Sequence, residues 1–211
     1  MTSQRTRERL VQRLAEQGID DSAVLDALRN VPRHLFLDEA MAHQAYENIA
    51  LPIGFQQTLS QPYIVARMTE LLVEGRERLG RVLEIGSGSG YQSAVLAALV
   101  DEVYALERIK PLLMAGRKRM RQLKLRNVQM RHGDGCDGWA AQAPFDGILV
   151  AAAAARIPRQ LLEQLAPGGR LVLPLGPREQ QTLALVACGE RGFERRDIEP
   201  VRFVPLVGGL A

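Results

Sequence analysis

The sequence has few cysteines, no long apolar run and no strong excess of either charge. Only Cys136 and Cys188 occur in 211 residues, without any paired spacing. This argues against a disulfide framework and a zinc site, and it suits a reducing compartment. Residues 1–17 are polar and charged, so no secretory signal is expected, and no apolar run approaches the ~18 residues of a membrane span. We therefore expect a cytoplasmic protein without a membrane partner.

The charge balance is close to neutral. There are 27 Lys and Arg residues against 24 Asp and Glu residues, which gives a net charge of +3. So small a surplus does not imply a nucleic-acid partner, and the densest basic run, 117–121, is best explained as a solvated helix face. With 46% hydrophobic and 24% charged residues, the composition is ordinary for a globular enzyme.

The N-terminal third predicts helices followed by a long loop. Apolar residues recur at helical spacing before and after Gly18, and residues 20–22 offer N-caps for the second helix. Residues 33–60 show no sustained period, and loops of this length in compact domains are usually functional. Pro62 then opens a helix that runs to Leu72, because proline is favoured in a first helical turn.

From residue 81 onward the pattern alternates between strand and helix, which predicts a parallel sheet covered on both faces. The expected strands are 81–85, 102–106, 127–131, 145–150 and 170–174, and the expected helices are 91–99, 109–123 and 157–165. Strands at 182–187 and 201–206 have no helix between them and should add an antiparallel edge. We expect one α/β domain, 1–211, with an N-terminal helical and substrate-loop extension (1–75) and a doubly wound, Rossmann-like core (76–211).

An apolar strand leads into three alternating glycines. Gly86, Gly88 and Gly90 let the backbone approach a bound cofactor more closely than side chains would permit. A dinucleotide-binding fingerprint needs a small residue where Tyr91 stands, for close helix–strand packing beneath a pyrophosphate. This mismatch argues against a nicotinamide cofactor.

Three carboxylates accompany three consecutive predicted strands. Glu84, inside the strand before the glycines, suits an ammonium better than a pyrophosphate. Glu107 can accept hydrogen bonds from ribose hydroxyls, and Asp134 can meet an adenine amino group. Each acid alone could equally be a cap or turn carboxylate, but together they predict S-adenosyl-L-methionine, which has no phosphate. The expected cofactor-binding residues are Glu84, Gly86, Ser87, Gly88, Ser89, Gly90, Glu107, Arg108, Asp134 and Gly135.

Two longer stretches carry a resemblance to a known family. Residues 57–66 read Gln-Thr-Leu-Ser-Gln-Pro-Tyr-Ile-Val-Ala, and residues 202–206 read Arg-Phe-Val-Pro-Leu. With further matches at 31–36, 51–54, 82–91, 133–135 and 165–174, the chain resembles the protein-L-isoaspartate O-methyltransferases, which repair damaged aspartyl and asparaginyl residues. The resemblance implies the class I S-adenosylmethionine-dependent methyltransferase fold. As departures, Leu59 stands where isoleucine is commoner, and Phe55-Gln56 replaces a pair that contains glycine in many bacterial members.

The resemblance also implies an activity and a substrate site. The implied reaction methylates the α-carboxylate of L-isoaspartyl residues in damaged proteins and peptides, giving a methyl ester and S-adenosylhomocysteine. Ser60 is the implied catalytic residue, and the implied substrate-binding residues are Gln57, Thr58, Leu59, Ser60, Val204, Pro205 and Leu206. A carboxylate with a pKa near ~4 is already ionised at neutral pH, so no general base is required. From the residues alone, Ser60 could equally be an ordinary N-cap, and the tail could be plain edge packing.

Two other functions share the glycine run. A methyltransferase for RNA or a small molecule would use the same cofactor, but amine methylation usually needs an Asp/Asn-Pro-Pro-aromatic loop where Ala151, Ala152 and Ala153 stand. A non-catalytic adaptor would keep the glycines and lose Ser60 or its loop. No heptad pattern specifies an oligomer, and a monomer is favoured.

Overall fold

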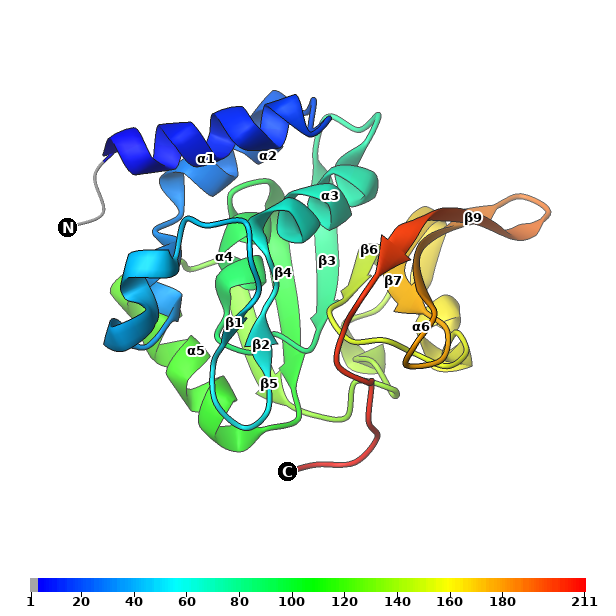
Figure 1. The fold of residues 1–211 in the computed structure, drawn as a ribbon. Helices are drawn as coiled ribbons and strands as arrows, with labels where there is room; N and C mark the ends of the chain where they lie inside the picture. Colours follow the sequence, from blue (N-terminus) through cyan, green and yellow to red (C-terminus); the bar gives the residue numbers. More distant parts are fainter. Residues whose placement is uncertain (1–3) are drawn as a thin grey trace.

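One seven-stranded sheet forms the centre of the protein, whose computed structural model describes residues 4–211 (Figure 1). The strand order is β5-β4-β3-β6-β7-β8-β9. Its strands are β3 (Leu79–Ile85), β4 (Val100–Glu107), β5 (Val128–His132), β6 (Phe145–Val150), β7 (Leu165–Leu175), β8 (Gln181–Gly189) and β9 (Gly192–Val201). Strands β3 to β7 are parallel, and β8 and β9 are antiparallel to their neighbours. The expected parallel sheet with an antiparallel edge is confirmed.

Six α-helices surround the sheet within the described residues. They are α1 (Gln4–Glu16), α2 (Ser22–Asn30), α3 (Pro62–Val73), α4 (Tyr91–Ala97), α5 (Lys110–Gln122) and α6 (Arg159–Glu163). Asp21 is the N-cap of α2, where its carboxylate accepts the N–H groups of Ala23 at 2.9 Å and Val24 at 3.0 Å. The expected long loop contains two 3-10 turns, Arg33–Phe36 and Glu39–Gln44, and a small hairpin of β1 (Leu51–Pro52) and β2 (Thr58–Leu59).

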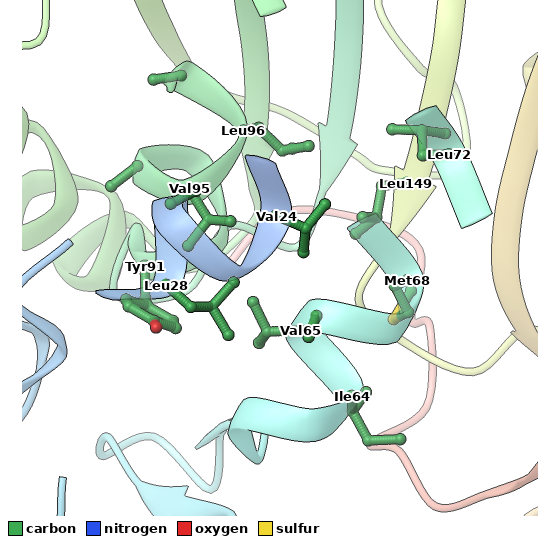
Figure 2. Close-up of a cluster of buried hydrophobic side chains, with 14 of the residues drawn as sticks. Val24, Leu28, Ile64, Val65, Met68, Leu72, Tyr91, Val95, Leu96 and Leu149 are labelled. Carbon is green, nitrogen blue, oxygen red and sulfur yellow. The ribbon is translucent and has the colours of Figure 1, made fainter. Parts of the chain in front are cut away.

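The two faces of the sheet bury separate clusters of apolar side chains. Val82, Val103 and Leu149 point into a cluster that includes helices α1 to α5, while Leu83 and Ile148 point into a second cluster with α6. The opposite faces follow from the two-residue period of a strand. Figure 2 shows side chains of α2, α3, α4 and β6 meeting in the first cluster. Its labelled members are Val24, Leu28, Ile64, Val65, Met68, Leu72, Tyr91, Val95, Leu96 and Leu149.

The last strand of the sheet differs from the expected one. We expected a strand at 201–206, but β9 occupies Gly192–Val201, and the β8–β9 hairpin projects from the side of the molecule (Figure 1). The prediction was wrong because β9 is charged and largely exposed, so it lacks the apolar signal of a strand, and backbone pairing with β8 defines it. The more apolar residues 202–206 leave the sheet edge and make a single bridge between Pro205 and Ala153.

The described residues form no disulfide cross-link. Cys136 and Cys188 are free thiols. Across residues 4–211, none of the helices combines the length and apolar character that crossing a bilayer requires. The same residues contain no group of His, Cys, Asp and Glu side chains arranged to hold a metal ion.

Candidate active site

A cavity of about 310 Å³ lies at the carboxyl ends of the parallel strands. Strand order reverses here, since the chain passes from β3 to β4 and β5 on one side and returns to β6 on the other. Open α/β sheets bind ligands at such a switch point. The expected site residues that line the cavity are Gln57, Thr58, Leu59, Ser60, Glu84, Gly86, Ser87, Gly88, Ser89, Glu107, Arg108, Gly135, Val204, Pro205 and Leu206. Segments far apart in the sequence therefore form one site.

The glycine loop curls over the end of the neighbouring strand. The N–H groups of Gly86 and Ser87 both donate to the carbonyl of Leu106, at 2.9 and 3.1 Å. Gly86 and Gly88 have φ values of +80° and +53°, in the left-handed region that favours glycine. Ser87 and Ser89 line the cavity, and their hydroxyls are buried without a hydrogen-bond partner within residues 4–211. Buried polar atoms without hydrogen-bond partners are uncommon in folded proteins, so these two hydroxyls indicate that a ligand binds at this loop.

Glu84 is the most deeply buried carboxylate of the cavity. Its Oε2 accepts a hydrogen bond from the Ser93 hydroxyl, and its Oε1 has no partner in the described part of the chain. Burial, reinforced by the nearby charge of Glu107 and opposed by the Ser93 hydrogen bond, raises the pKa of Glu84 to about 8. Glu84 has no cationic partner among residues 4–211, and because it lines the cavity, a bound ligand could supply one.

Glu107 ends β4 and holds two backbone segments together. Its Oε2 accepts the N–H of Gly88 at 2.7 Å, and its Oε1 accepts the N–H of Ile109 at 2.9 Å. The carboxylate thereby fixes the glycine loop beside the end of β4. Carboxylate oxygens have further lone pairs, so these bonds leave capacity for hydroxyl donors from a ligand.

Ser60 lies just before α3 but does not cap it. Helix α3 begins at Pro62. Gln61 is its N-cap residue, but the Gln61 side chain makes no hydrogen bond to the helix. The cap acceptor comes instead from Asn48, whose Oδ1 accepts the Tyr63 N–H at 2.9 Å. The interpretation of Ser60 as an ordinary N-cap is therefore wrong. Ser60 lines the cavity, and within residues 4–211 its hydroxyl makes no hydrogen bond, whereas its carbonyl accepts one from Arg33.

The C-terminal tail crosses the carboxyl end of β6. Ala153 donates its N–H to the carbonyl of Val204 at 2.8 Å and accepts the N–H of Leu206 at 2.7 Å. Gln181 adds two bonds to the backbone of Phe203, accepting its N–H at 2.6 Å and donating to its carbonyl at 3.2 Å. These contacts place residues 204–206 on the cavity wall rather than along the sheet edge.

Two expected site residues lie outside the cavity lining. Gly90, with φ +91°, packs beneath the loop, where an added Cβ would stand 2.9 Å from the Met120 side chain. The Asp134 carboxylate accepts backbone N–H groups from Cys136 and Gly209, and these bonds outweigh burial and lower its pKa. Asp134 therefore fastens the C-terminal tail in this structure.

Comparison with known proteins gives one family. The model of the protein-L-isoaspartate(D-aspartate) O-methyltransferases (PCMT) matches residues 4–211. The chain belongs to this family. It is 57% identical over 209 residues, 99% of both chains, to protein-L-isoaspartate O-methyltransferases of Pseudomonas paraeruginosa and of Ectopseudomonas mendocina.

Solved structures of the family agree with the fold. A protein-L-isoaspartate O-methyltransferase superposes with a TM-score of 0.87 at 27% identity, over 97% of this chain and 67% of that one. A putative member from Plasmodium falciparum, solved in complex with S-adenosyl-L-homocysteine, gives a TM-score of 0.80 at 26% identity over 95% and 98%. The expected class I methyltransferase fold is confirmed.

Several residues that line the cavity of this protein-L-isoaspartate O-methyltransferase family member are not predicted from the sequence. Ile64, Val65 and Met68 of α3 line the cavity, although their helical spacing predicts only core packing. Gln92 lines it from α4 and donates to the hydroxyl of Thr69 at 2.9 Å. Apolar spacing does not separate a side chain that faces a core from one that faces a cavity, so only the shared position of these residues at the sheet switch point reveals them.

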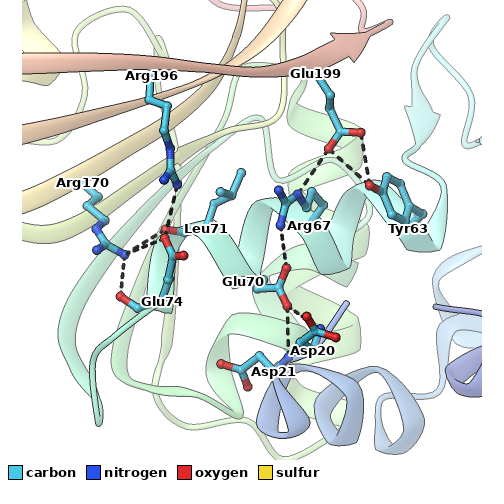
Figure 3. Close-up of polar contacts among 10 residues, drawn as sticks. All are labelled: Asp20, Asp21, Tyr63, Arg67, Glu70, Leu71, Glu74, Arg170, Arg196 and Glu199. Carbon is cyan, nitrogen blue, oxygen red and sulfur yellow. Dashed lines mark hydrogen bonds and ion pairs between the residues drawn. The ribbon is translucent and has the colours of Figure 1, made fainter. Parts of the chain in front are cut away.

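An ion pair connects α3 to the edge strand β9, and backbone hydrogen bonds connect α3 to the loop between α1 and α2 (Figure 3). Glu199 of β9 accepts a hydrogen bond from the Tyr63 hydroxyl at 3.2 Å and lies 3.4 Å from Arg67 Nε. Arg67 also bonds Glu70 at 2.8 Å, and Glu70 accepts the N–H of Asp20 at 2.8 Å. In this family member the helix that follows Ser60 is therefore tied to the strand that precedes the tail.

Proposed function

We propose that this chain transfers the methyl group of S-adenosyl-L-methionine to the α-carboxylate of L-isoaspartyl residues in damaged proteins and peptides. The products are a methyl ester and S-adenosyl-L-homocysteine. The observation that carries the proposal is that Ser60, Glu84 and Glu107 line one cavity in a chain of this family.

The residues of the cavity fit this cofactor. Within residues 4–211, one carboxylate oxygen of Glu84 has no hydrogen-bond partner, which suits the ammonium of the methionyl end, and the Ser87 and Ser89 hydroxyls have none either. Among the described residues lining the cavity, Arg108 is the single Lys or Arg, and it already donates to the Gly209 carbonyl at 3.0 Å. Such a lining favours a cation without phosphates. When bound, S-adenosyl-L-methionine supplies an electrophilic methyl group on a sulfonium.

Glu107, three glycines and Asp134 would make the remaining contacts with the cofactor. Glu107 would accept hydrogen bonds from the ribose hydroxyls while keeping its bonds to the backbone. Gly86, Gly88 and Gly135 line the cavity and would let the backbone approach the ligand closely, because none of them has a Cβ. Asp134 would accept the adenine amino group with lone pairs left over from its bonds to Cys136 and Gly209, or after releasing Gly209.

Ser60 would hold the substrate. Its hydroxyl is uncommitted and can donate to the isoaspartyl carboxylate, which needs donors because a buried carboxylate without partners is costly. The peptide would lie between residues 57–60 and 204–206. Since the carboxylate is already ionised, the protein's contribution is alignment and exclusion of water, which can lower a barrier by roughly 7–11 kcal/mol.

The cellular location, the partners and the oligomeric state complete the proposal. We assign it to the cytoplasm on its cysteine usage, and its partners are isoaspartyl-containing proteins and peptides, with no nucleic acid or membrane required. A single domain with an extension at 1–75 and a core at 76–211 is supported by the apolar cluster that both parts share. A monomer is the expected state.

A paired-peptide assay tests the proposed function. The protein is incubated with S-adenosyl-L-methionine labelled in the methyl group and either an isoaspartyl peptide or its normal aspartyl twin. Base-labile label only on the isoaspartyl peptide is expected. Equal labelling of both peptides, or label that appears only when RNA is added, would contradict the proposal.

A further inference from the structure

Arg33 is a fully buried cation in the loop before the first small hairpin. Its exposed fraction is 0%, and none of the carboxylates in residues 4–211 forms an ion pair with it. The guanidinium donates instead to backbone carbonyls: Nε to Ala45 at 2.8 Å, and Nη2 to Ser60 at 2.8 Å and to Ile49 at 3.5 Å. One of its strongest hydrogen bonds thus ends on the peptide group of the proposed catalytic residue.

The same guanidinium also contacts the end of the cofactor loop. Its Cζ lies 4.9 Å from the centre of the Tyr91 ring, and Tyr91 is the first residue of α4, directly after Gly90. Phe36 packs edge-on against that ring, with the centroids 5.4 Å apart. Burial raises the pKa of the Tyr91 hydroxyl to about 12, so the ring is neutral and offers Arg33 a π face rather than a counter-charge.

Burying the Arg33 side chain costs free energy that an apolar side chain of similar volume would not. A buried charge is costly unless hydrogen bonds compensate it, and apolar residues of similar volume often stabilise a core as well or better. Arg33 Nη1 has no hydrogen-bond partner in the described part of the chain, so compensation is incomplete. An apolar side chain could not bind the Ser60 carbonyl. The planar, rigid guanidinium of Arg33 can fix the orientation of that carbonyl relative to the cofactor loop.

We infer that Arg33 is a positioning residue for Ser60, which fixes the Ser60 peptide against the end of the cofactor loop and acts on turnover without contacting cofactor or substrate. The inference rests on the proposed role of Ser60. It assigns a role to the stretch 31–36, which the sequence singles out and the proposed reaction does not use.

Arg33→Lys is the first test, with single-turnover methylation of an isoaspartyl peptide as the readout. Lysine keeps the charge and loses the fork, so we expect the rate to fall on the order of 30-fold, while the dissociation constant for S-adenosyl-L-homocysteine, measured by calorimetry, changes less than threefold. Arg170→Lys is the matched control, because Arg170 donates to the carbonyls of Leu71 and Glu74 at the far end of α3. That variant should retain the wild-type rate.

A double-variant cycle separates this inference from the proposed role of Ser60. In a Ser60→Ala background, Arg33→Lys should lower the rate less than threefold further, because the group that it positions is gone. A full 30-fold further loss would overturn the inference, as would a wild-type rate in Arg33→Lys alone. A wild-type rate in Ser60→Ala alone would instead overturn the role of Ser60.

Chemical rescue covers the case in which a variant is damaged by poor folding. Arg33→Ala leaves room for a small guanidinium ion, so millimolar ethylguanidinium should raise its single-turnover rate at least fivefold, and ethylammonium at the same ionic strength should not. Rescue by both cations would show that charge alone matters and would contradict the inference. Circular dichroism and a thermal melt on each sample show that folded protein is being compared.

Discussion

The cofactor half and the substrate half of the cavity are built in different ways. The cofactor half (Glu84, residues 86–89 and Glu107) comes from two consecutive strands of the parallel sheet and the loop between strand and helix. The substrate half (residues 57–60 and 204–206) joins a short segment that contains β2 to a segment of the C-terminal tail, far apart in the sequence. The first is organised by sheet geometry. The second is held by side chains and backbone outside it: Arg33 binds the Ser60 carbonyl, and Ala153 binds the backbone of Val204 and Leu206.

The difference separates binding from alignment. In the cofactor half, buried polar atoms without partners indicate where a ligand completes the structure. In the substrate half, Arg33 binds the Ser60 carbonyl and Ala153 binds the backbone of Val204 and Leu206, while the Ser60 hydroxyl makes no hydrogen bond within residues 4–211. We therefore expect substitutions in the first half to change cofactor affinity, and substitutions in the second to change turnover or peptide recognition.

Ser60→Ala should give the largest effect. Ser60 orients the carboxylate oxygen for in-line attack, and a misplacement of about 1 Å can cost roughly 10²-fold, so we expect single-turnover methylation to fall about 100-fold. Affinity for S-adenosyl-L-homocysteine should stay within about twofold, since Ser60 belongs to the substrate half. A variant that instead loses cofactor affinity and keeps its rate would break the division between the halves.

Glu84→Gln should act on affinity and on its pH dependence. The carboxyl has a pKa of about 8 in the free protein, and a bound ammonium favours its ionised form, so wild-type affinity for S-adenosyl-L-homocysteine should rise by up to tenfold per unit between pH 6 and 8. Glutamine cannot ionise, so affinity should be about 10- to 100-fold weaker at pH 8 and nearly independent of pH. Calorimetry in buffers of different ionisation enthalpy measures the released proton.

The same substitution should change stability with the opposite sign. The pKa of Glu84 is raised from 4.5 to about 8 on folding, so its favourable contribution is complete below pH 4.5 and is lost as the pH rises through 8. Without ligand, Glu84→Gln should therefore melt at a higher temperature than the wild type at pH 8.5, with a smaller difference at pH 5. An equal difference at both pH values would contradict the raised pKa.

Glu199→Gln should have a smaller effect, confined to the substrate half. The variant weakens the link between β9 and α3, while Glu199 and Arg67 are partly exposed, so the loss of stability should be only about 0.5–1 kcal/mol. We expect the KM for an isoaspartyl peptide to rise about threefold at unchanged kcat. Asp197→Asn, which removes an exposed pair with Arg195 on the same strand, is the matched control and should leave KM unchanged.

Gln56→Gly should give the smallest effect. Gln56 has φ +57°, a conformation that costs a non-glycine residue energy, so glycine should raise the free energy of unfolding by about 0.5 kcal/mol. Lys124→Gly, at φ +56° after α5, should give a similar gain and serves as the control for backbone strain alone. Because Gln56 lines the cavity, only its variant should also change the KM for peptides; equal KM changes in both would contradict this.

The two halves also differ in how far the sequence predicts them. Glycine spacing and strand periodicity predict Glu84, Glu107 and the cofactor loop, because consecutive βα units place their carboxyl ends together. No local rule brings residue 60 beside residue 204, and only the family resemblance predicts that pair. The charged strand β9 and the Asn48 cap were missed because each depends on backbone pairing or a distant side chain, neither of which leaves a periodic signal.

The pH dependence of single-turnover methylation at saturating cofactor tests the central claim most directly. If the protein only aligns an already ionised carboxylate, and the titration of Glu84 affects cofactor binding alone, the rate should be constant within about twofold from pH 6 to 8.5. A rate that rises about tenfold per pH unit across this range would show that a general base removes a proton during transfer, and would contradict the account.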